Sequence, residues 1–468
     1  MHADRMSALE GLAAFVSGAT PPAEARSRAA NAILDTVGVA LAGSAEPAAR
    51  IVQETLEPSN PRTLGLWDRR TSDAADRRVT GPCAIWGTSL HASAPDAALA
   101  NGTAAHALDF DDMCFVSLAH PSAPLVPAII AAGELVGATG RAILDAYVVG
   151  FEIQARLGRL MNPRHYQRGW HCTSTLGVMS AAAGASRLLS LDAIATANAL
   201  AIAASSASGL KENFGTMVKP LHAGQAARDG VMAALLAKGG MTASDKAIDG
   251  PQGYLHALDS EREDLDREIA DLGRRWEVLD SGITVKLYPS CAGTHPALDA
   301  ILDLRAEHGF SADDIDRIDV DVDPIVPTIL IYDRPASALE AKFSLPFCAA
   351  AACVFGRVGI DTFASAALQD GRVAVLMSRV AMRVDDEIGR GKPALTEARV
   401  RITLKDGRTL TKDAHGARGY PANPASAADL EAKFLGCASR VMELGRARVL
   451  YQRLAGLESA DTVTSLGH

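Results

Sequence analysis

Ionisable side chains gather most densely in the segment that ends at His120. Asp109, Asp111 and Asp112 lie within four residues, behind an alanine-rich stretch that predicts a helix over residues 96–107. A buried carboxylate is costly unless a cation pairs with it, so three of them indicate either a solvated helix end or a site that holds charge. Proton transfer is the chemistry that carboxylates and imidazoles perform together.

The same segment could also hold a metal ion. Clustered aspartates bind Mg²⁺ on diphosphate substrates when a second acidic segment completes the site, and the sequence contains no such segment. The imidazole candidates His106, His120 and His171 lack the His-x-x-x-His or cysteine spacing of a zinc site. We therefore expect no metal here.

Three further clusters combine cations with small or hydroxyl residues. His171 stands before three hydroxyl residues at a helix start, where free N–H groups suit an anion. Lys219 and His222 lie in a glycine-bearing loop before a helix expected to open near Ala223, and Lys286 begins the third cluster. Each loop suits carboxylate binding, and each is equally typical of an ordinary N-cap or a solvated surface loop.

Cysteine chemistry is a weaker possibility. Cys291 and His295 are four residues apart across a glycine, so they form a nucleophile and base only if the fold turns them toward each other. The seven cysteines are scattered and contain no C-x-x-C pair, which fits neither a disulfide framework nor a zinc or iron–sulfur ligand set.

The hydrophobic spacing predicts helices from the start of the chain to about residue 270. Apolar residues recur at intervals of three and four, with Gly or Pro at the breaks. Residues 22–42 show one such helix, which Pro22 opens and Gly43 closes. Further segments are apolar on almost every face and are typical of the inner helices of a bundle: residues 128–136, 143–151, 176–189, 193–204 and 231–237.

Between residues 275 and 419 the period changes to that of strands. Alternating polar and apolar residues predict strands with one wet face at residues 317–322, 379–384, 399–404 and, after a hairpin turn at Asp406-Gly407, 408–410. An alanine-rich helix is predicted between them, over residues 346–355, and residues 427–456 are helical again. These patterns predict a mainly α fold in which an α+β domain, residues 273–419, separates helical parts over 1–272 and 420–468.

The composition excludes several classes of protein. The 468 residues carry a net charge of −9 without a dense basic stretch, so nucleic acid is not an expected partner. No run of about 18 uncharged apolar residues occurs, so we expect no contact with a membrane. The first twenty residues contain acidic groups and only a short apolar patch, which predicts a cytoplasmic protein rather than a secreted one.

Five motifs follow one another along nearly the whole chain: His106-Ala-Leu-Asp-Phe-Asp-Asp112, His120-Pro-Ser122, Gly169-Trp-His-Cys-Thr-Ser174, Lys219-Pro-Leu-His-Ala-Gly224 and Lys286-Leu-Tyr-Pro-Ser-Cys291. In this order they resemble the MmgE/PrpD family, which includes 2-methylcitrate dehydratase, cis-aconitate decarboxylase and iminodisuccinate epimerase. The resemblance implies an enzyme of small di- or tricarboxylates that needs no metal or organic cofactor. It also implies a homodimer whose site lies between a large helical domain and a smaller α+β lid domain.

The resemblance further implies roles for individual residues. The catalytic positions of the family fall on Asp109, His120, His171, Lys219 and Lys286. The expected substrate-binding residues are His222, Ser174, Cys291, Tyr332 and Met113. Two of these depart from the family pattern, because Cys291 stands where the decarboxylases carry a histidine and Met113 where many relatives have threonine.

The reactions of the family share proton transfer at a carbon next to a carboxylate. That C–H is weakly acidic, so a base must touch it and fixed cations must meet the developing charge. We expect Asp109 or His171 to take the proton, His120 to act as the acid, and the lysines to bind carboxylates. A 2-methylcitrate dehydratase-like lyase ranks first, a decarboxylase-like or epimerase-like enzyme is the alternative, and a non-catalytic carboxylate-binding protein is a further one.

Overall fold

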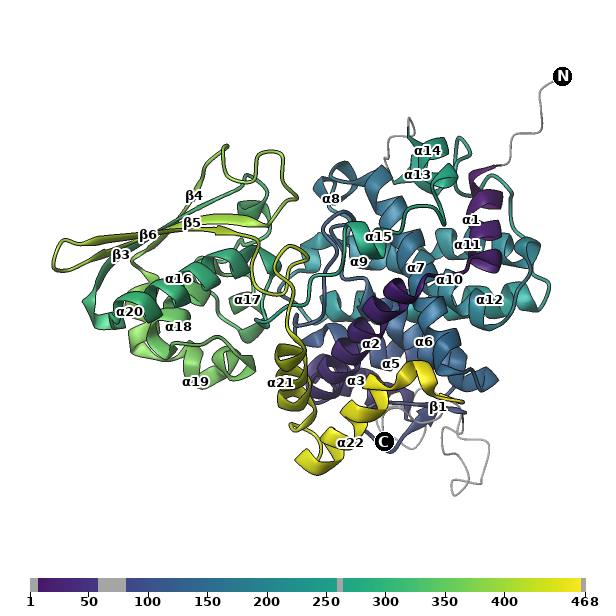
Figure 1. The fold of residues 1–468 in the computed structure, drawn as a ribbon, viewed down its shortest axis with the longest axis horizontal. Coiled ribbons are helices and arrows are strands. Elements are labelled where there is room, and N and C mark those ends of the chain that lie inside the picture. The colour runs from purple at the N-terminus through teal and green to yellow at the C-terminus, as the bar shows by residue number, and fades with distance from the viewer. Residues whose placement is uncertain (1–6, 58–80, 259–263, 464–468) are drawn as a thin grey trace.

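The computed structural model describes residues 7–57, 81–258 and 264–463. Helices make up most of the molecule, and a small sheet with its own helices projects from one end of the helical body (Figure 1). The fold is therefore mainly α with a smaller α+β part, as the sequence predicts. No helix among these residues is long and apolar enough to cross a membrane.

Most of the helical body is built from the part of the chain before residue 281. Its longer helices are α1 (Ala8–Gly18), α2 (Ala23–Gly43), α3 (Pro47–Leu56), α5 (Ala94–Ala107), α6 (Ser122–Val136), α7 (Gly140–Met161), α10 (Gly177–Leu188), α11 (Ala193–Ser206) and α12 (Val218–Lys238). Shorter elements lie in the connections: β1 (Cys83–Ala84), β2 (His91–Ala92), α8 (Arg164–Gln167), α9 (Cys172–Thr175), α13 (Tyr254–Ala257), α14 (Leu265–Ala270) and α15 (Glu277–Asp280). The predicted helices over residues 22–42 and 96–107 and the five apolar segments are all confirmed.

Small residues let α5 and α12 pack with their backbones in contact. A Cβ on Gly102 would lie 2.9 Å from the Cα of Gly224, and a Cβ on Gly224 would lie 2.4 Å from the carbonyl oxygen of Leu99. Only glycine fits at such a crossing. The close packing matters for the site, because α5 carries His106 in its last turn and α12 carries Lys219 in its first turn.

The start of α12 corrects one prediction. Lys219 and Pro220 do not break the chain before a helix near Ala223, since α12 begins at Val218 and contains both. Proline is tolerated in the first turn of a helix, where its missing N–H has no partner to lose. Lys219 therefore sits on a rigid helix rather than in a loop.

The sheet of the α+β part has the strand order β4-β3-β5-β6. It consists of β3 (Ile315–Val322), β4 (Val380–Val384), β5 (Glu397–Leu404) and β6 (Thr409–His415), and only the β3–β4 pair is parallel. One face is covered by helices α16 (His295–His308) and α18 (Leu345–Phe355) (Figure 1). The α+β part also contains α17 (Ala338–Ala341), α19 (Ser365–Leu368) and α20 (Gly371–Met377). The predicted strands and the 346–355 helix are confirmed, whereas α16 was not predicted.

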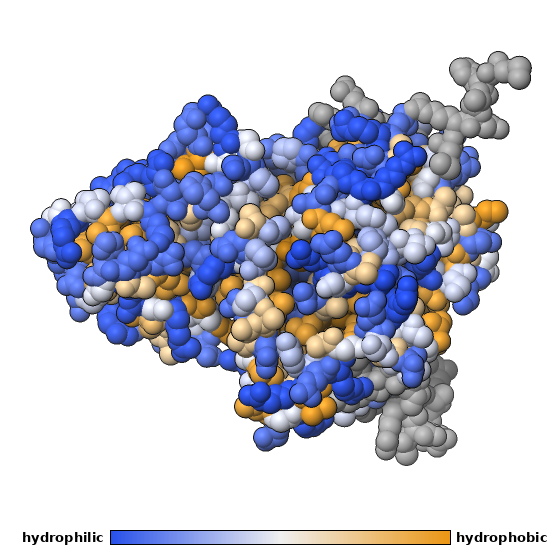
Figure 2. All heavy atoms as spheres, in the orientation of Figure 1, coloured by the Kyte–Doolittle hydropathy of each residue, from blue (hydrophilic) through white to orange (hydrophobic). Residues whose placement is uncertain are grey.

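The chain then returns to the helical body. The predicted helix over residues 427–456 is two helices, α21 (Ala427–Ala438) and α22 (Leu444–Ala455). Phe434 of α21 packs against Gly38 of α2, where a Cβ would lie 2.7 Å from the ring. On the face shown in Figure 2, hydrophilic residues dominate the sheet end, and hydrophobic residues gather in the middle of the view, near α2 and α21.

Candidate active site

A cavity lined by buried residues lies between the loops that follow α5, the start of α12 and the loops of the α+β part. Six of the predicted site residues line it: Asp109, Met113, His120, His171, Lys219 and Cys291. They come from four separate stretches of sequence, and the fold brings them together.

Backbone strain is concentrated around this cavity. Among the residues that the structure describes, four non-glycine residues have positive φ angles, and three of them line the cavity: Asp109 (52°), Leu118 (47°) and Leu395 (68°). A left-handed conformation costs a non-glycine residue about 1–3 kcal/mol and persists only where the surroundings enforce it. Strain of this kind clusters at functional sites, so it supports the cavity as the candidate active site.

The carboxylate of Asp109 is held between two ammonium groups. Lys219 Nζ donates to Asp109 Oδ1 at 2.7 Å, and Lys286 Nζ lies 3.3 Å from Oδ2. Burial alone would raise the pKa of Asp109, but the two lysines hold the pKa well below its ordinary value. Asp109 is therefore an anion at neutral pH and a weak base.

Three buried lysines also hold the backbone of this segment. Lys342 Nζ donates to the carbonyl of Leu108 at 2.7 Å and Lys286 Nζ to the carbonyl of Asp109 at 3.1 Å. Lys433 Nζ donates to the next carbonyl, that of Phe110, at 2.8 Å. Three successive carbonyls thus bond to ammonium groups from three distant parts of the chain. Neither Lys342 nor Lys433 was singled out in the sequence.

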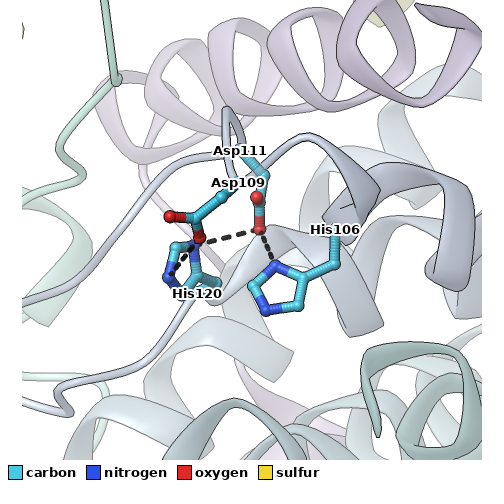
Figure 3. Close-up of side chains that lie close together, drawn as sticks. All are labelled: His106, Asp109, Asp111 and His120. Atoms are coloured by element: carbon cyan, nitrogen blue, oxygen red, sulfur yellow. Dashed lines mark hydrogen bonds and ion pairs between the residues drawn. The ribbon is translucent and has the colours of Figure 1, made fainter. Parts of the chain in front are cut away.

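Asp111 lies between two histidines, His106 and His120 (Figure 3). Its Oδ2 lies 2.8 Å from His106 Nδ1 and 3.1 Å from His120 Nδ1. Burial would raise the pKa of Asp111, but the two imidazoles hold it well below its ordinary value. Burial lowers the pKa of His106 to about 3 and lowers that of His120 as well. Both imidazoles are therefore neutral at pH 7, with Asp111 ionised.

The contacts of His106 assign its tautomer. In His106, Nδ1 donates to Asp111 and Nε2 accepts from Lys219 Nζ at 3.0 Å. In His120, Nδ1 lies 3.1 Å from Asp111 Oδ2 without forming a hydrogen bond. Its Nε2 lies 3.7 Å from Asp109 Oδ1, and His120 lines the cavity. The neutral His120 thus has one unprotonated ring nitrogen beside these two carboxylates.

His171 and His222 form a second imidazole pair. Their Nδ1 atoms are 3.1 Å apart, so one donates to the other. Burial lowers the pKa of His171 well below its ordinary value and that of His222 to about 4. Ser174 Oγ donates to the carbonyl of His222 at 3.3 Å. His171 lines the cavity, whereas His222 and Ser174 lie behind it.

The other predicted residues have different positions. Tyr332 does not line the cavity, and its hydroxyl donates to the carbonyl of Phe214 at 3.0 Å. Burial raises the pKa of the Cys291 thiol to about 11, and His295 instead contacts the carbonyl of Ser290 at 3.1 Å. The thiol is therefore protonated at neutral pH, which disfavours a covalent mechanism.

Asp111 and three neighbouring side chains also resemble the donor set of a metal site. One ligand atom each of His106, Asp109, Asp111 and His120 lies within 4.8 Å of the others. Lys219 and Lys286 already bring two positive charges to Asp109. A divalent ion among these ligands would face both ammonium groups at short range, so the donor set fits a proton-transfer site better than a metal site.

Several cavity residues had no signal in the sequence. The apolar side chains Leu118, Phe214, Ile329, Phe343 and Leu395 line the cavity with Tyr166, Thr173 and Ala292. A scattered apolar residue gives no pattern that distinguishes a cavity wall from the core. Thr173 is the exception, because it belongs to the motif of His171, and its Oγ1 accepts from the backbone N–H of His120 at 3.1 Å.

Comparison with known proteins matches two family domains along the chain. The model of the MmgE/PrpD N-terminal domain matches residues 10–265, and that of the C-terminal domain matches residues 288–455. The chain is 28% identical over 397 residues to the cis-aconitate decarboxylase of Homo sapiens, with 82% of this chain and 80% of that protein covered. It is 29% identical over 403 residues to the Mus musculus enzyme of that name, with 82% and 80% covered. A cis-aconitate decarboxylase-like protein of Aspergillus oryzae is 26% identical over 470 residues, with 95% and 92% covered.

Proposed function

The chain belongs to the MmgE/PrpD family, and from this premise we propose that it is a lyase that moves a proton at the carbon next to a carboxylate of a small di- or tricarboxylate. One observation carries the proposal. Lys219 Nζ and His120 Nε2 lie 2.7 and 3.7 Å from the same oxygen of Asp109, on the wall of a buried cavity. A cation and a neutral imidazole thus meet where a substrate would lie.

The charges around the candidates favour His120 as the base. An imidazolium formed at His120 would be stabilised by Asp111 and Asp109. The charged neighbour of His171 is Lys219, which opposes its protonation, whereas at His120 the two carboxylates act against Lys219 and Lys286. Asp109 is a weak base because two lysines hold it as an anion. We therefore assign proton removal to His120 and the orientation of His120 and Lys219 to Asp109.

Lys219 is assigned to the substrate carboxylate. Removal of the α-proton leaves an electron pair that delocalises onto this carboxylate. The ammonium group of Lys219 stabilises the negative charge that develops there. In a dehydration the pair forms the C=C bond while the β-hydroxyl leaves as water with a returned proton. A decarboxylation removes no α-proton: CO₂ leaves, the C–C electron pair stays on the carbon, and this carbon takes a proton from the protonated form of His120, which regains it from water. In an epimerisation the proton returns to the opposite face.

The relatives bear on the choice among these reactions. Cis-aconitate decarboxylase is the name of the Homo sapiens and Mus musculus relatives. This favours the decarboxylase-like alternative over the 2-methylcitrate dehydratase that ranked first in the sequence analysis. We propose decarboxylation first and dehydration second for this chain, with epimerisation as the third possibility.

We also propose that the enzyme is a homodimer. Support comes from exposed apolar side chains near the cavity, on two segments that the Tyr332–Phe214 hydrogen bond joins: Leu210, Met217, Val218 and Ile331. Contiguous exposed apolar side chains are typical of contact surfaces. Light scattering of the eluted protein tests this, and a monomeric mass would contradict it.

Proton NMR in D₂O tests the proposed activity. The purified protein is incubated with citrate, 2-methylcitrate, cis-aconitate, iminodisuccinate and shorter hydroxy diacids. We expect deuterium uptake or a new product with the wild type and a loss of about 10²- to 10⁴-fold in rate in Asp109→Asn. The exposed Asp316 supplies the matched control Asp316→Asn, which should keep the wild-type rate. Silence of the folded wild type with every acid would contradict the proposal.

A further inference from the structure

Tyr166 is the one buried tyrosine whose hydroxyl has no hydrogen-bond partner among the residues that the structure describes. Five tyrosines are buried, and the hydroxyl groups of the other four form hydrogen bonds with protein groups: Tyr147, Tyr254, Tyr288 and Tyr420. A buried tyrosine hydroxyl ordinarily finds such a partner, because leaving it unpaired costs free energy. The unpaired hydroxyl of Tyr166 therefore indicates a partner that is not part of the protein.

Tyr166 lies on the wall of the cavity, together with Asp109 and Cys291. It belongs to the short helix α8 and is only 6% exposed. Burial raises the pKa of its hydroxyl well above the ordinary value, and the neighbouring Cys291, Cys172 and Asp109 raise it further. The hydroxyl thus keeps its proton at neutral pH. Tyr166 can therefore donate a hydrogen bond to a molecule in the cavity.

Lys211 holds both the ring and the backbone of Tyr166. Its Nζ lies 3.7 Å from the centroid of the Tyr166 ring, where an ammonium group is attracted to the ring face. The same Nζ donates to the Tyr166 carbonyl at 3.3 Å. The backbone of Lys211 is fixed in turn, because its N–H donates to the carbonyl of Gly169 at 2.8 Å. The phenol is therefore preorganised, and little freedom is lost when it binds a ligand.

Lys211 also carries a charge that no described carboxylate balances. The acceptor of its Nζ is the Tyr166 carbonyl, and within the described ranges no carboxylate lies at ion-pair distance from it. Burial lowers the pKa of Lys211. Lys219 and Lys286, by contrast, both contact the carboxylate of Asp109. An anion bound beside Tyr166 would therefore gain from a positive charge that is not yet neutralised.

A substrate with two carboxylates needs two places in the cavity that accept negative charge. The proposed function assigns one carboxylate to Lys219, and a second one buried without a partner would be costly. We propose that Tyr166 is a substrate-binding residue whose hydroxyl donates a hydrogen bond to a second carboxylate of the substrate, and that Lys211 is its positioning residue. This inference rests on the proposed function, since that function supplies a substrate with at least two carboxylates.

Removal of one hydroxyl tests the role of Tyr166. Tyr166→Phe keeps the ring that Lys211 contacts, so the variant should fold as the wild type does. Citrate and propane-1,2,3-tricarboxylate are the probes, because they carry the same three carboxylates and differ only in the hydroxyl of citrate. Titration calorimetry should show that both acids bind about 10- to 100-fold more weakly to the variant, since the lost hydrogen bond has a charged acceptor.

Two comparisons show whether the loss belongs to the hydroxyl of Tyr166. Tyr451 lies on α22, outside the cavity lining, and gives the matched control Tyr451→Phe, which should keep both affinities. The loss in Tyr166→Phe should be the same at pH 6 and pH 8, because the hydroxyl stays protonated across that range. A loss that appears at only one of these pH values would contradict a neutral hydroxyl as the donor.

A double-variant cycle tests the role of Lys211. Lys211→Met should weaken the binding of both acids about 3- to 10-fold, because the ring of Tyr166 loses its cation. The same change should cost less in Tyr166→Phe, where the part that acts through the hydroxyl is already lost. The exposed Lys392 gives the control Lys392→Met, which should keep both affinities. Equal losses in the two backgrounds would overturn the positioning role.

The outcomes separate this inference from the proposed function. Equal affinity of the wild type and Tyr166→Phe for both acids would overturn the inference, and turnover in the D₂O assay would still uphold the lyase. A loss confined to citrate would also overturn it, because Tyr166 would then contact the hydroxyl of citrate rather than a carboxylate. Weaker binding of both acids to Tyr166→Phe, without exchange or product from the wild type, would support the binding residue and contradict the lyase. Absence of binding of both acids to the wild type would contradict the inference, and the D₂O assay with its wider panel would decide the lyase on its own.

Discussion

Lys286 contacts Asp109 twice, because its Nζ donates to the backbone carbonyl at 3.1 Å and lies 3.3 Å from the carboxylate oxygen Oδ2. Asp109 adopts a φ of 52°, and the same ammonium group thus holds both its strained backbone and its charge. Lys342 and Lys433 bond the carbonyls on either side. The position of the carboxylate therefore depends on lysines that do not line the cavity.

Lys342→Met should lower kcat about 10- to 100-fold, because loss of the hydrogen bond to the Leu108 carbonyl displaces Asp109. KM should change less than kcat. Burial lowers the pKa of Lys342 to about 8. The wild-type kcat should therefore fall as the pH rises through 8, where the ammonium loses its charge, and this alkaline limb should be absent in Lys342→Met. The exposed Lys392 provides the control Lys392→Met, which should keep the limb. A limb that persists in Lys342→Met would rule out this positioning role.

Lys433→Met should destabilise the protein by about 3–5 kcal/mol, because it leaves the buried carboxylate of Asp35 without its cation at 2.7 Å. The double variant Asp35→Asn with Lys433→Met should recover much of that stability, since no charge then remains buried. Thermal midpoints of the wild type, both single variants and the double variant measure the effect. A double variant no more stable than Lys433→Met would show that the pair is not the cause.

The acidic limb of the kcat/KM profile should lie below pH 6.5. In a dehydration or an epimerisation, His120 acts as a base only when it is neutral, so activity is lost as the pH falls through its pKa, which burial lowers. Asp111 opposes that shift, so Asp111→Asn should move the limb to still lower pH. Initial rates between pH 4 and 8 measure both profiles. A wild-type limb at or above pH 6.5 would exclude His120 as the base assigned here.

Removal of metal ions should leave the activity unchanged. Although His106, Asp109, Asp111 and His120 bring ligand atoms within 4.8 Å, Lys219 and Lys286 compensate the Asp109 charge. Dialysis against EDTA, followed by rate measurement and metal analysis, tests this. Loss of activity that a stoichiometric divalent ion restores would show that the four side chains form a metal centre.

Local patterns were sufficient for much of the fold. Apolar residues at intervals of three and four over 22–42 predicted α2, and alternating polar and apolar residues over 399–404 predicted β5. The side chains of β5 that face the core are Ala398, Val400, Ile402 and Leu404. These patterns work because a helix or strand repeats its own geometry every few residues. α16 escaped prediction, since its apolar residues are interrupted by charged ones.

The sequence by itself determined which residues could do chemistry, because carboxylate, imidazole and ammonium groups are recognisable wherever they stand. Asp109, His120, His171 and Lys219 were all found in this way, and all line one cavity. Their partners were decided only by the tertiary structure. Lys342 and Lys433 lie 234 and 323 residues from the carbonyls they hold, and the cavity lining includes both Met113 and Leu395. Contacts between distant segments depend on how whole elements pack, and no local spacing encodes that packing.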